Sequence, residues 1–231
     1  MHKLEYFSDF YKKAPLTIPI FITLFSLVLR TVCFNLFQVV FSDESTIQVL
    51  DDRIQTVRRR SGEQFKAECL KKTLKFPQKI MVWGAISWHG TSRLHIVDGT
   101  MNQDKYIKVL ETRLLPQTRE WFREMPWIFQ QDSAPCHTAK RVKTWCRQNG
   151  VRVLPWAGNS PDMNPIENLW DVLKDEIVHE VPITNKTQLI ERLIRVWFHS
   201  AKIKELCQTY ISGMPRRVQA LLSAKGGQTK Y

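Results

Sequence analysis

The sequence predicts an α/β domain: a mixed sheet flanked by helices, with extra helices at the C-terminal end. Antiparallel strand patterns come first and are followed by a strand–helix–strand run, which requires a crossover and parallel pairing. The chain has 231 residues, of which 43% are hydrophobic and 24% charged. It is therefore long and apolar enough to bury one core of ordinary domain size.

The first half of the domain is predicted as short strands followed by a helix. Phe37–Phe41 and Ser45–Leu50 are expected to be two strands around a tight Asp-Glu turn. The apolar and β-branched run Ile80–Trp88 predicts a buried strand, and Arg93–Val97 alternates as its hairpin partner. Asn102 is predicted to cap a helix, because apolar residues recur at helical spacing after it.

Strands and helices alternate in the second half. Trp127–Gln131 predicts a short strand that ends at Asp132, and Thr138–Asn149 predicts an amphipathic helix. Val151–Leu154 is expected to be another short strand. The remaining helices are predicted at Ile166–Val178, Thr187–His199, Ala201–Ser212 and Pro215–Ala224.

Positive charge is concentrated in two segments. The chain carries 34 Lys and Arg against 22 Asp and Glu, a net charge of +12, which favours a polyanionic partner. Residues 51–79 hold nine basic and four acidic side chains, and residues 201–231 hold six and one. Either segment alone is also compatible with a plain solvated surface. Together they predict phosphate contacts, through Arg58, Arg59, Arg60, Lys71, Lys72, Arg216 and Arg217.

Two further features concern the compartment of the protein. Its five cysteines are odd in number, scattered and without C-x-x-C spacing, which fits a reducing compartment rather than a disulfide framework. Leu16–Leu29 lies in an uncharged run that falls short of the roughly 18 to 20 apolar residues of a membrane span. Membrane association through Leu16–Leu29 is therefore the minority alternative to an apolar helix or unrelated sequence.

Three acidic residues stand where strands end or a helix begins: Asp43, Asp132 and Glu167. In α/β folds, acids at the ends of apolar strands are exposed at the edge where ligands bind. Carboxylates that lie close together repel each other and need a cation, and Mg²⁺ prefers carboxylate, water and phosphate oxygens. Two such ions can activate a water or hydroxyl and stabilise the leaving oxygen of a phosphodiester. Taken alone, each acid is equally compatible with a turn or a helix cap.

Longer motifs connect these acids to a family. The strings FSDES, VWGAIS, QQDSAPCHTA, SPDMNPIENLW and MPRRVQALLSAKGGQTKY resemble the catalytic half of Tc/mariner-type transposases of the Tc branch. The resemblance runs from about Phe41 to the C-terminus. Asp132 and Glu167 are separated by 34 residues, the spacing that marks this branch. The family's ribonuclease H-like fold agrees with the predicted strand order.

The resemblance implies a site and a reaction. Asp43, Asp132 and Glu167 would be the three metal-binding acids of a DDE site, with Mg²⁺ or Mn²⁺ and no small-molecule cofactor. They would serve DNA cleavage and strand transfer by in-line attack on phosphate. The implied setting is the nucleus, with DNA as partner and a homo-oligomer assembled on it.

Three polar residues are expected around the acids. By analogy with the family, His137 lies near the site and contacts metal-bound water or phosphate, while a capping or packing role is the alternative. Asn164 and Asn168 flank Glu167 and are expected to orient it.

The chain departs from the family pattern in two main places. Ser133 replaces the Asn that usually follows the second Asp, and the N-terminal helix-turn-helix modules of the family are not in this sequence. We therefore expect a truncated copy without end recognition, with a catalytically idle DNA-binding remnant as the alternative. The expected division is an unrelated apolar segment at 1–35, the catalytic domain at 36–200 and a basic helical tail at 201–231.

Overall fold

The computed structural model describes residues 36–48, 79–156, 163–178, 183 and 185–224. Its sheet has the strand order β3-β2-β1-β5, and β4 also pairs with β2. The central strand β1 is antiparallel to β2 and parallel to β5. The strands are β1 (Val39–Gln48), β2 (Lys79–Ser87), β3 (Gly90–Thr91), β4 (His95–Val97) and β5 (Ile128–Gln130).

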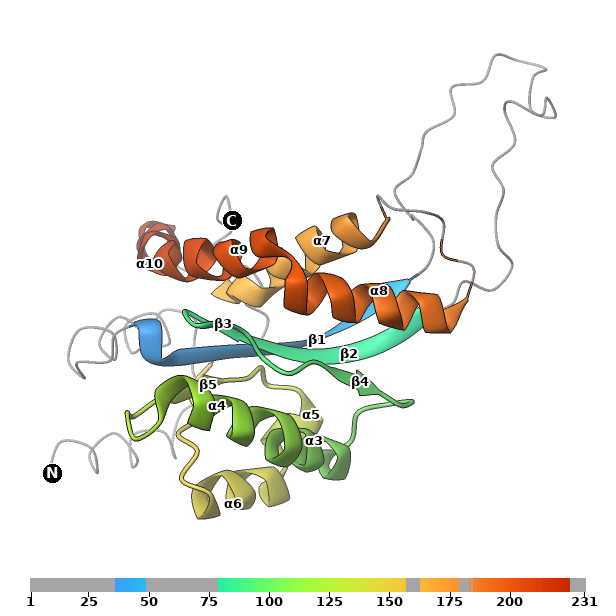
Figure 1. The fold of residues 1–231 in the computed structure, drawn as a ribbon. Coiled ribbons are helices and arrows are strands. Elements are labelled where there is room, and N and C mark those ends of the chain that lie inside the picture. Colours follow the sequence, from blue (N-terminus) through green and yellow to red (C-terminus); the bar gives the residue numbers. More distant parts are fainter. Residues whose placement is uncertain (1–35, 49–78, 157–162, 179–182, 184, 225–231) are drawn as a thin grey trace, which may run out of the picture.

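Helices cover both faces of this sheet (Figure 1). One layer contains α7 (Pro165–Val178), α8 (Lys186–His199), α9 (Ala201–Ser212) and α10 (Met214–Ser223). The opposite layer contains α3 (Gln103–Val109), the π-helical turn η3 (Leu110–Leu114), α4 (Leu115–Phe122), α5 (Pro135–Thr138) and α6 (Lys140–Gln148). A 3₁₀ turn, η1 (Leu36–Gln38), precedes β1.

Each layer packs its own hydrophobic core against the sheet. Successive side chains of a strand point to opposite faces, so neighbouring residues of β1 enter different cores. Phe41 packs with Trp170 and Trp197 of the C-terminal layer, whereas Val40 packs with Tyr106 of the other layer. The predicted α/β class, with a mixed sheet and extra C-terminal helices, is confirmed.

One predicted element boundary was wrong and another is shifted by two residues. The two strands expected around an Asp-Glu turn are one continuous strand, because β1 pairs with β2 without interruption through Asp43 and Glu44. The helix expected at Thr138–Asn149 is α6, which begins two residues later because Ala139, with φ −55° and ψ 142°, separates it from the short helix α5.

Two predicted strands are shorter than expected. Only His95–Val97 of the hairpin partner Arg93–Val97 pairs as a strand. Val151–Leu154 contributes a single parallel bridge, between Val153 and Phe129, and no regular strand within the described residues. The other predicted helices and strands agree with the structure to within two residues.

No helix in the described part of the chain is long and apolar enough to cross a membrane. The Leu16–Leu29 segment lies outside the described residues. In those parts of the chain that are described, Cys136, Cys146 and Cys207 are free thiols.

Candidate active site

Asp43 lies in the middle of β1, directly opposite Gly84 of β2. Its carboxylate is partly buried and accepts a hydrogen bond from the Nε1–H of Trp170, with Oδ2 and Nε1 3.1 Å apart. The first acid of the site is therefore held by the rigid centre of the sheet and by a tryptophan of α7.

Asp132 follows β5 by two residues. The last residue of β5, Gln130, pairs with Phe41, so continuing the register brings Asp132 level with Asp43 on the neighbouring strand. The Ser42 hydroxyl donates to the Gln130 carbonyl at 2.9 Å, and the backbone N–H of Ala134 donates to Asp132 Oδ1 at 2.9 Å. These bonds fix the end of β5 against β1.

Glu167 lies in the first turn of α7. The residue before this helix, Asn164, is buried and donates from Nδ2 to the carbonyl of Ser42 at 3.2 Å. The Glu167 backbone N–H in turn donates to the Asn164 carbonyl at 3.1 Å. The start of α7, and with it Glu167, is thus anchored to β1 one residue from Asp43.

The three acids are electrostatically coupled. Burial, and then the charges of Glu167 and Glu44, raise the pKa of Asp43 to about 8. Burial, and then the nearby charges of Asp171 and Asp132, raise the pKa of Glu167. The charge of Glu167 raises the pKa of Asp43, and the charge of Asp132 raises the pKa of Glu167. The three carboxylates therefore share one electrostatic environment.

His137 bridges Asp132 and a second carboxylate, Glu44, that the motifs did not single out. Its Nδ1 contacts Asp132 Oδ1, and its Nε2 lies 3.2 Å from Glu44 Oε1. Burial would lower the pKa of His137, but the hydrogen bonds to the two carboxylates raise it to about 9. The hydrogen bond from His137 in turn lowers the pKa of Asp132. At neutral pH the imidazolium is therefore a cation held between two anions.

The other side of His137 is closed by an aromatic ring. The ring centroids of Tyr106 and His137 are 4.0 Å apart. The Tyr106 hydroxyl donates to Gln131 Oε1 at 2.8 Å. Gln131 Nε2 donates to the His137 carbonyl at 3.2 Å. His137 is thus packed against Tyr106 and bonded to Asp132, and its contact with metal-bound water or phosphate stays a prediction.

The remaining predicted residues lie in different surroundings. Asn168 is half buried in α7, and its side chain makes no hydrogen bond within the described residues. Arg216 is exposed, as a phosphate contact requires, but Arg217 is only 6% exposed, which does not fit its predicted role at the DNA surface. Five other predicted DNA contacts lie outside the described residues: Arg58, Arg59, Arg60, Lys71 and Lys72.

The side chains of the acids do not form a ready-made metal cage. Across the described ranges, no group of three His, Cys, Asp or Glu side chains is placed to hold a metal ion together. The Asp132 carboxylate contacts His137 in this arrangement. The donor set itself, three carboxylates in one electrostatic environment, is the kind that Mg²⁺ and Mn²⁺ take.

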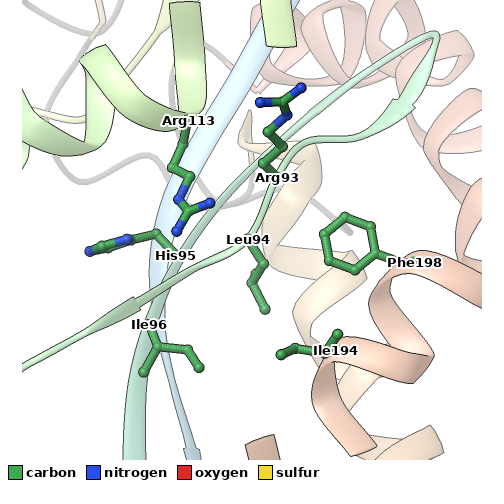
Figure 2. A pocket seen from close by; sticks show the side chains of 7 residues that line it. All are labelled: Arg93, Leu94, His95, Ile96, Arg113, Ile194 and Phe198. Carbon is green, nitrogen blue, oxygen red and sulfur yellow. The ribbon is translucent and has the colours of Figure 1, made fainter. Parts of the chain in front are cut away.

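A cavity of about 390 Å³ lies elsewhere, between β4, η3 and α8. Figure 2 shows the guanidinium groups of Arg93 and Arg113 on one side of it and the apolar side chains of Ile194 and Phe198 on the other. None of the three acids lines this cavity.

Comparison with known proteins decides the family. The model of the DDE superfamily endonucleases matches residues 38–190. The Tcb2 transposable element transposase of Caenorhabditis briggsae is 36% identical over 194 residues, which make up 83% of this chain and 70% of that protein. The chain belongs to the DDE endonucleases of Tc-type transposases. It contains the DDE endonuclease domain of this transposase family, as the motifs predicted.

Solved structures of a DDE transposase show the same fold. The Mos1 transposase paired-end complex with left transposon end matches with a TM-score of 0.75 and 21% identity over 92% of this chain. The catalytic domain of Mos1 mariner transposase matches with a TM-score of 0.66 and 18% identity, over 92% of this chain and 94% of that domain. The chain spans 62% of the transposase in the paired-end complex. The predicted ribonuclease H-like fold of this DDE domain is confirmed.

Proposed function

We propose that this DDE domain cleaves DNA phosphodiester bonds and joins DNA strands, with Asp43, Asp132 and Glu167 as its metal-binding acids. The observation that carries the proposal is the environment of the Asp43 carboxylate, which is partly buried and close to other acids. Burial, and then the charges of Glu167 and Glu44, raise the pKa of this partly buried carboxylate to about 8. Such a site gains most from a divalent cation, which would compensate both the burial and the repulsion.

Mg²⁺ or Mn²⁺ is the proposed cofactor. All three donors are carboxylate oxygens, which these hard ions prefer. Paired-end complexes of Mos1 have been solved with Mn and with Mg. When bound, the metal would supply a Lewis acid and an activated water or hydroxyl for attack on phosphorus.

The protein's own residues would hold the acids in place for this attack. Asn164 ties the start of α7, and so Glu167, to β1. His137 fixes the carboxylate of Asp132 from the side of Glu44. These contacts hold the start of α7 beside β1 and Asp132 beside His137 before DNA arrives, and the three side chains would still have to turn toward one another to share a metal.

DNA is the proposed partner, and the nucleus the proposed compartment. The net charge of +12 favours a polyanion, and the Mos1 complex that shares this fold contains a transposon end. We further propose that the chain assembles as a homo-oligomer on DNA, which light scattering with and without duplex would test.

A nicking assay on supercoiled DNA tests the reaction. Asp43→Asn, Asp132→Asn and Glu167→Gln should each lower the Mg²⁺- or Mn²⁺-dependent nicking rate by more than about 100-fold, beyond the 10- to 100-fold typical of residues outside the metal shell. Asp98→Asn, an exposed aspartate after β4, is the matched control and should keep full activity.

Thermal melting of the same proteins tests the metal site directly. Mg²⁺ or Mn²⁺ should raise the melting temperature of the parent chain, because an ion that binds only the folded state stabilises it. The shift should disappear in Asp132→Asn. DNA binding without nicking and without a metal-dependent shift would instead favour the alternative of a catalytically idle DNA-binding remnant.

A further inference from the structure

We propose that Trp170 is a positioning residue for Asp43. Trp197 holds the Trp170 ring in place, and the absence of a side chain at Gly84 leaves room for that ring. The inference rests on the proposed function, since it assigns a role toward the metal-binding carboxylate. Trp170 is only 2% exposed, and its indole N–H donates to Asp43 Oδ2 at 3.1 Å. A buried indole N–H needs an acceptor, and here that acceptor is one of the proposed metal-binding carboxylates.

The Trp170 ring is fixed by a second tryptophan. Trp197 of α8 stacks on it with ring centroids 5.0 Å apart and an interplanar angle of 19°. The Trp197 indole N–H donates to the Ser92 carbonyl at 2.7 Å, and the hydroxyl of Thr91 donates to the Trp197 carbonyl at 3.2 Å. The stack is therefore tied at one end to the β3 segment and at the other end to Asp43.

Gly84 makes room for this stack. It is the residue of β2 directly opposite Asp43. A Cβ atom built there would lie 2.8 Å from Cη2 of Trp170 and 3.1 Å from Cη2 of Trp197. Any larger residue would push Trp170 off the strand and carry its N–H away from Asp43.

The consequence concerns how the carboxylate is presented. Since Oδ2 is bonded to a rigid indole, the rotation of the Asp43 carboxylate is restricted and Oδ1 remains for a cation. A hydrogen bond to an ionised group is stronger than one between neutral groups, and burial keeps water from replacing it. Trp170 would thus keep the Asp43 carboxylate oriented for metal binding.

Trp170→Phe and Trp197→Phe form a matched pair. Each variant keeps an aromatic ring in the stack and loses one buried indole N–H, so both should melt lower than the parent chain. Only Trp170→Phe removes the bond to Asp43. We expect its Mn²⁺ affinity in isothermal titration calorimetry to fall by about tenfold, the scale of one hydrogen bond to a charged group, with Trp197→Phe unchanged.

A double-mutant cycle with Gly84→Ala separates packing from positioning. Gly84→Ala should lower both the melting temperature and the Mn²⁺ affinity. In Gly84→Ala combined with Trp170→Phe, the smaller ring should recover part of the melting temperature while the affinity stays low. Recovery of both properties together would show that the stack acts only through stability, which would overturn the positioning role.

The indole N–H signal provides a readout that needs no metal. The ¹H–¹⁵N signal that disappears in Trp170→Phe should shift markedly in Asp43→Asn and hardly in Asp98→Asn. Equal Mn²⁺ affinities in the two tryptophan variants, or an indole signal indifferent to Asp43→Asn, would overturn the inference alone. A parent chain that binds no divalent ion would overturn the proposed function and, with it, this role.

Discussion

Asp43 and Glu44 are neighbours in sequence but belong to different environments. Successive side chains of a strand point to opposite faces, so Asp43 meets Trp170 under α7 while Glu44 meets His137 of α5. Once Asp43 is placed in a strand, the same alternation sends Glu44 to the other face. Because Asp43 and Glu44 were predicted as a turn, where side chains do not alternate, Glu44 was not predicted as a residue of the site.

Replacing Asp43 should stabilise the metal-free protein at alkaline pH. Its pKa rises from 3.8 to about 8 on folding, so the folded state binds the extra proton. Stability is therefore lost as pH rises from about 4 to 8 and stays low above that. The asparagine of Asp43→Asn cannot ionise, so this variant does not lose stability as the pH rises. It should therefore be more stable than the parent chain in EDTA at pH 8, on the order of a few kcal/mol.

Urea unfolding in EDTA at pH 4, 6 and 8 would measure the effect. The advantage of Asp43→Asn should grow with pH, and Asp98→Asn should follow the parent chain. An advantage that is the same at all three values would mean that the carboxylate's charge is not the cause.

His95, at the cavity beside Arg113, should titrate at a lower pH than an exposed histidine. Burial, and then the positive charges of Arg113 and Lys108, lower its pKa from 6.5. Below pH 6.5 the unfolded chain therefore binds more protons at this residue, and stability falls as pH decreases. Arg113→Gln should raise the pKa of His95 measured by NMR, whereas Arg93→Gln, which also lines the cavity, should change it less.

At the scale of elements, the helices begin at residues that satisfy their free N–H groups. Asn102 Oδ1 accepts from the backbone of Asp104 and Lys105 at the start of α3, and Asn185 does the same for Gln188 in α8. Caps are local, so Asn102 could be predicted from the sequence, whereas the start of α8 was predicted from its periodicity and the cap at Asn185 was found only in the structure.

The cap of α3 should contribute measurably to stability. Asn102→Ala leaves two backbone N–H groups without their acceptor and should cost about 1 kcal/mol of unfolding free energy. Asn102→Asp keeps the acceptor and should cost much less. Urea denaturation of the three proteins at neutral pH would compare them, and equal losses for Ala and Asp would argue against a capping role.

At the scale of the molecule, α9 contributes to the hydrophobic core between the C-terminal helical layer and the sheet. Ile203, Cys207 and Ile211 are fully buried and belong to the same hydrophobic cluster as Phe41 and Trp170. The boundary at residue 200 was drawn from charge alone, and it stays a prediction. The packing of α9 indicates that the helices beyond it unfold with the sheet.

Shortening a buried side chain of α9 leaves a cavity in the core and should therefore destabilise the whole domain. Ile211→Ala should cost about 2 to 5 kcal/mol, as other buried Ile to Ala changes do, and lower a single cooperative transition. Exposed Glu205→Ala is the control in the same helix. Circular dichroism and tryptophan fluorescence should give coincident curves, and an early transition confined to helical signal would support a separate tail.

DNA binding by the whole chain should depend on salt more than on sequence. Phosphate contacts carry no sequence information, and their affinity falls with salt at a log–log slope of about −0.9 per neutralised phosphate. Replacing Arg58, Arg59 and Arg60 with Ala should weaken binding to all duplexes about equally and flatten this slope. Competition between transposon-end and scrambled duplex at two salt concentrations tests it, and a hundredfold preference for the end sequence would contradict it.

The sequence by itself determined the class of the domain, its helices and its motifs, and it proposed the three candidate acids. These depend on periodicity, caps and short strings, which are local properties of the chain. Only the tertiary structure decided that β1 runs unbroken through Asp43, that His137 joins Asp132 to Glu44, and that Trp170 donates to Asp43. Those contacts join residues 93 and 127 positions apart, for His137–Glu44 and Trp170–Asp43 respectively. Their partners are chosen by strand register and by how α5 and α7 pack on the sheet, which no local pattern encodes.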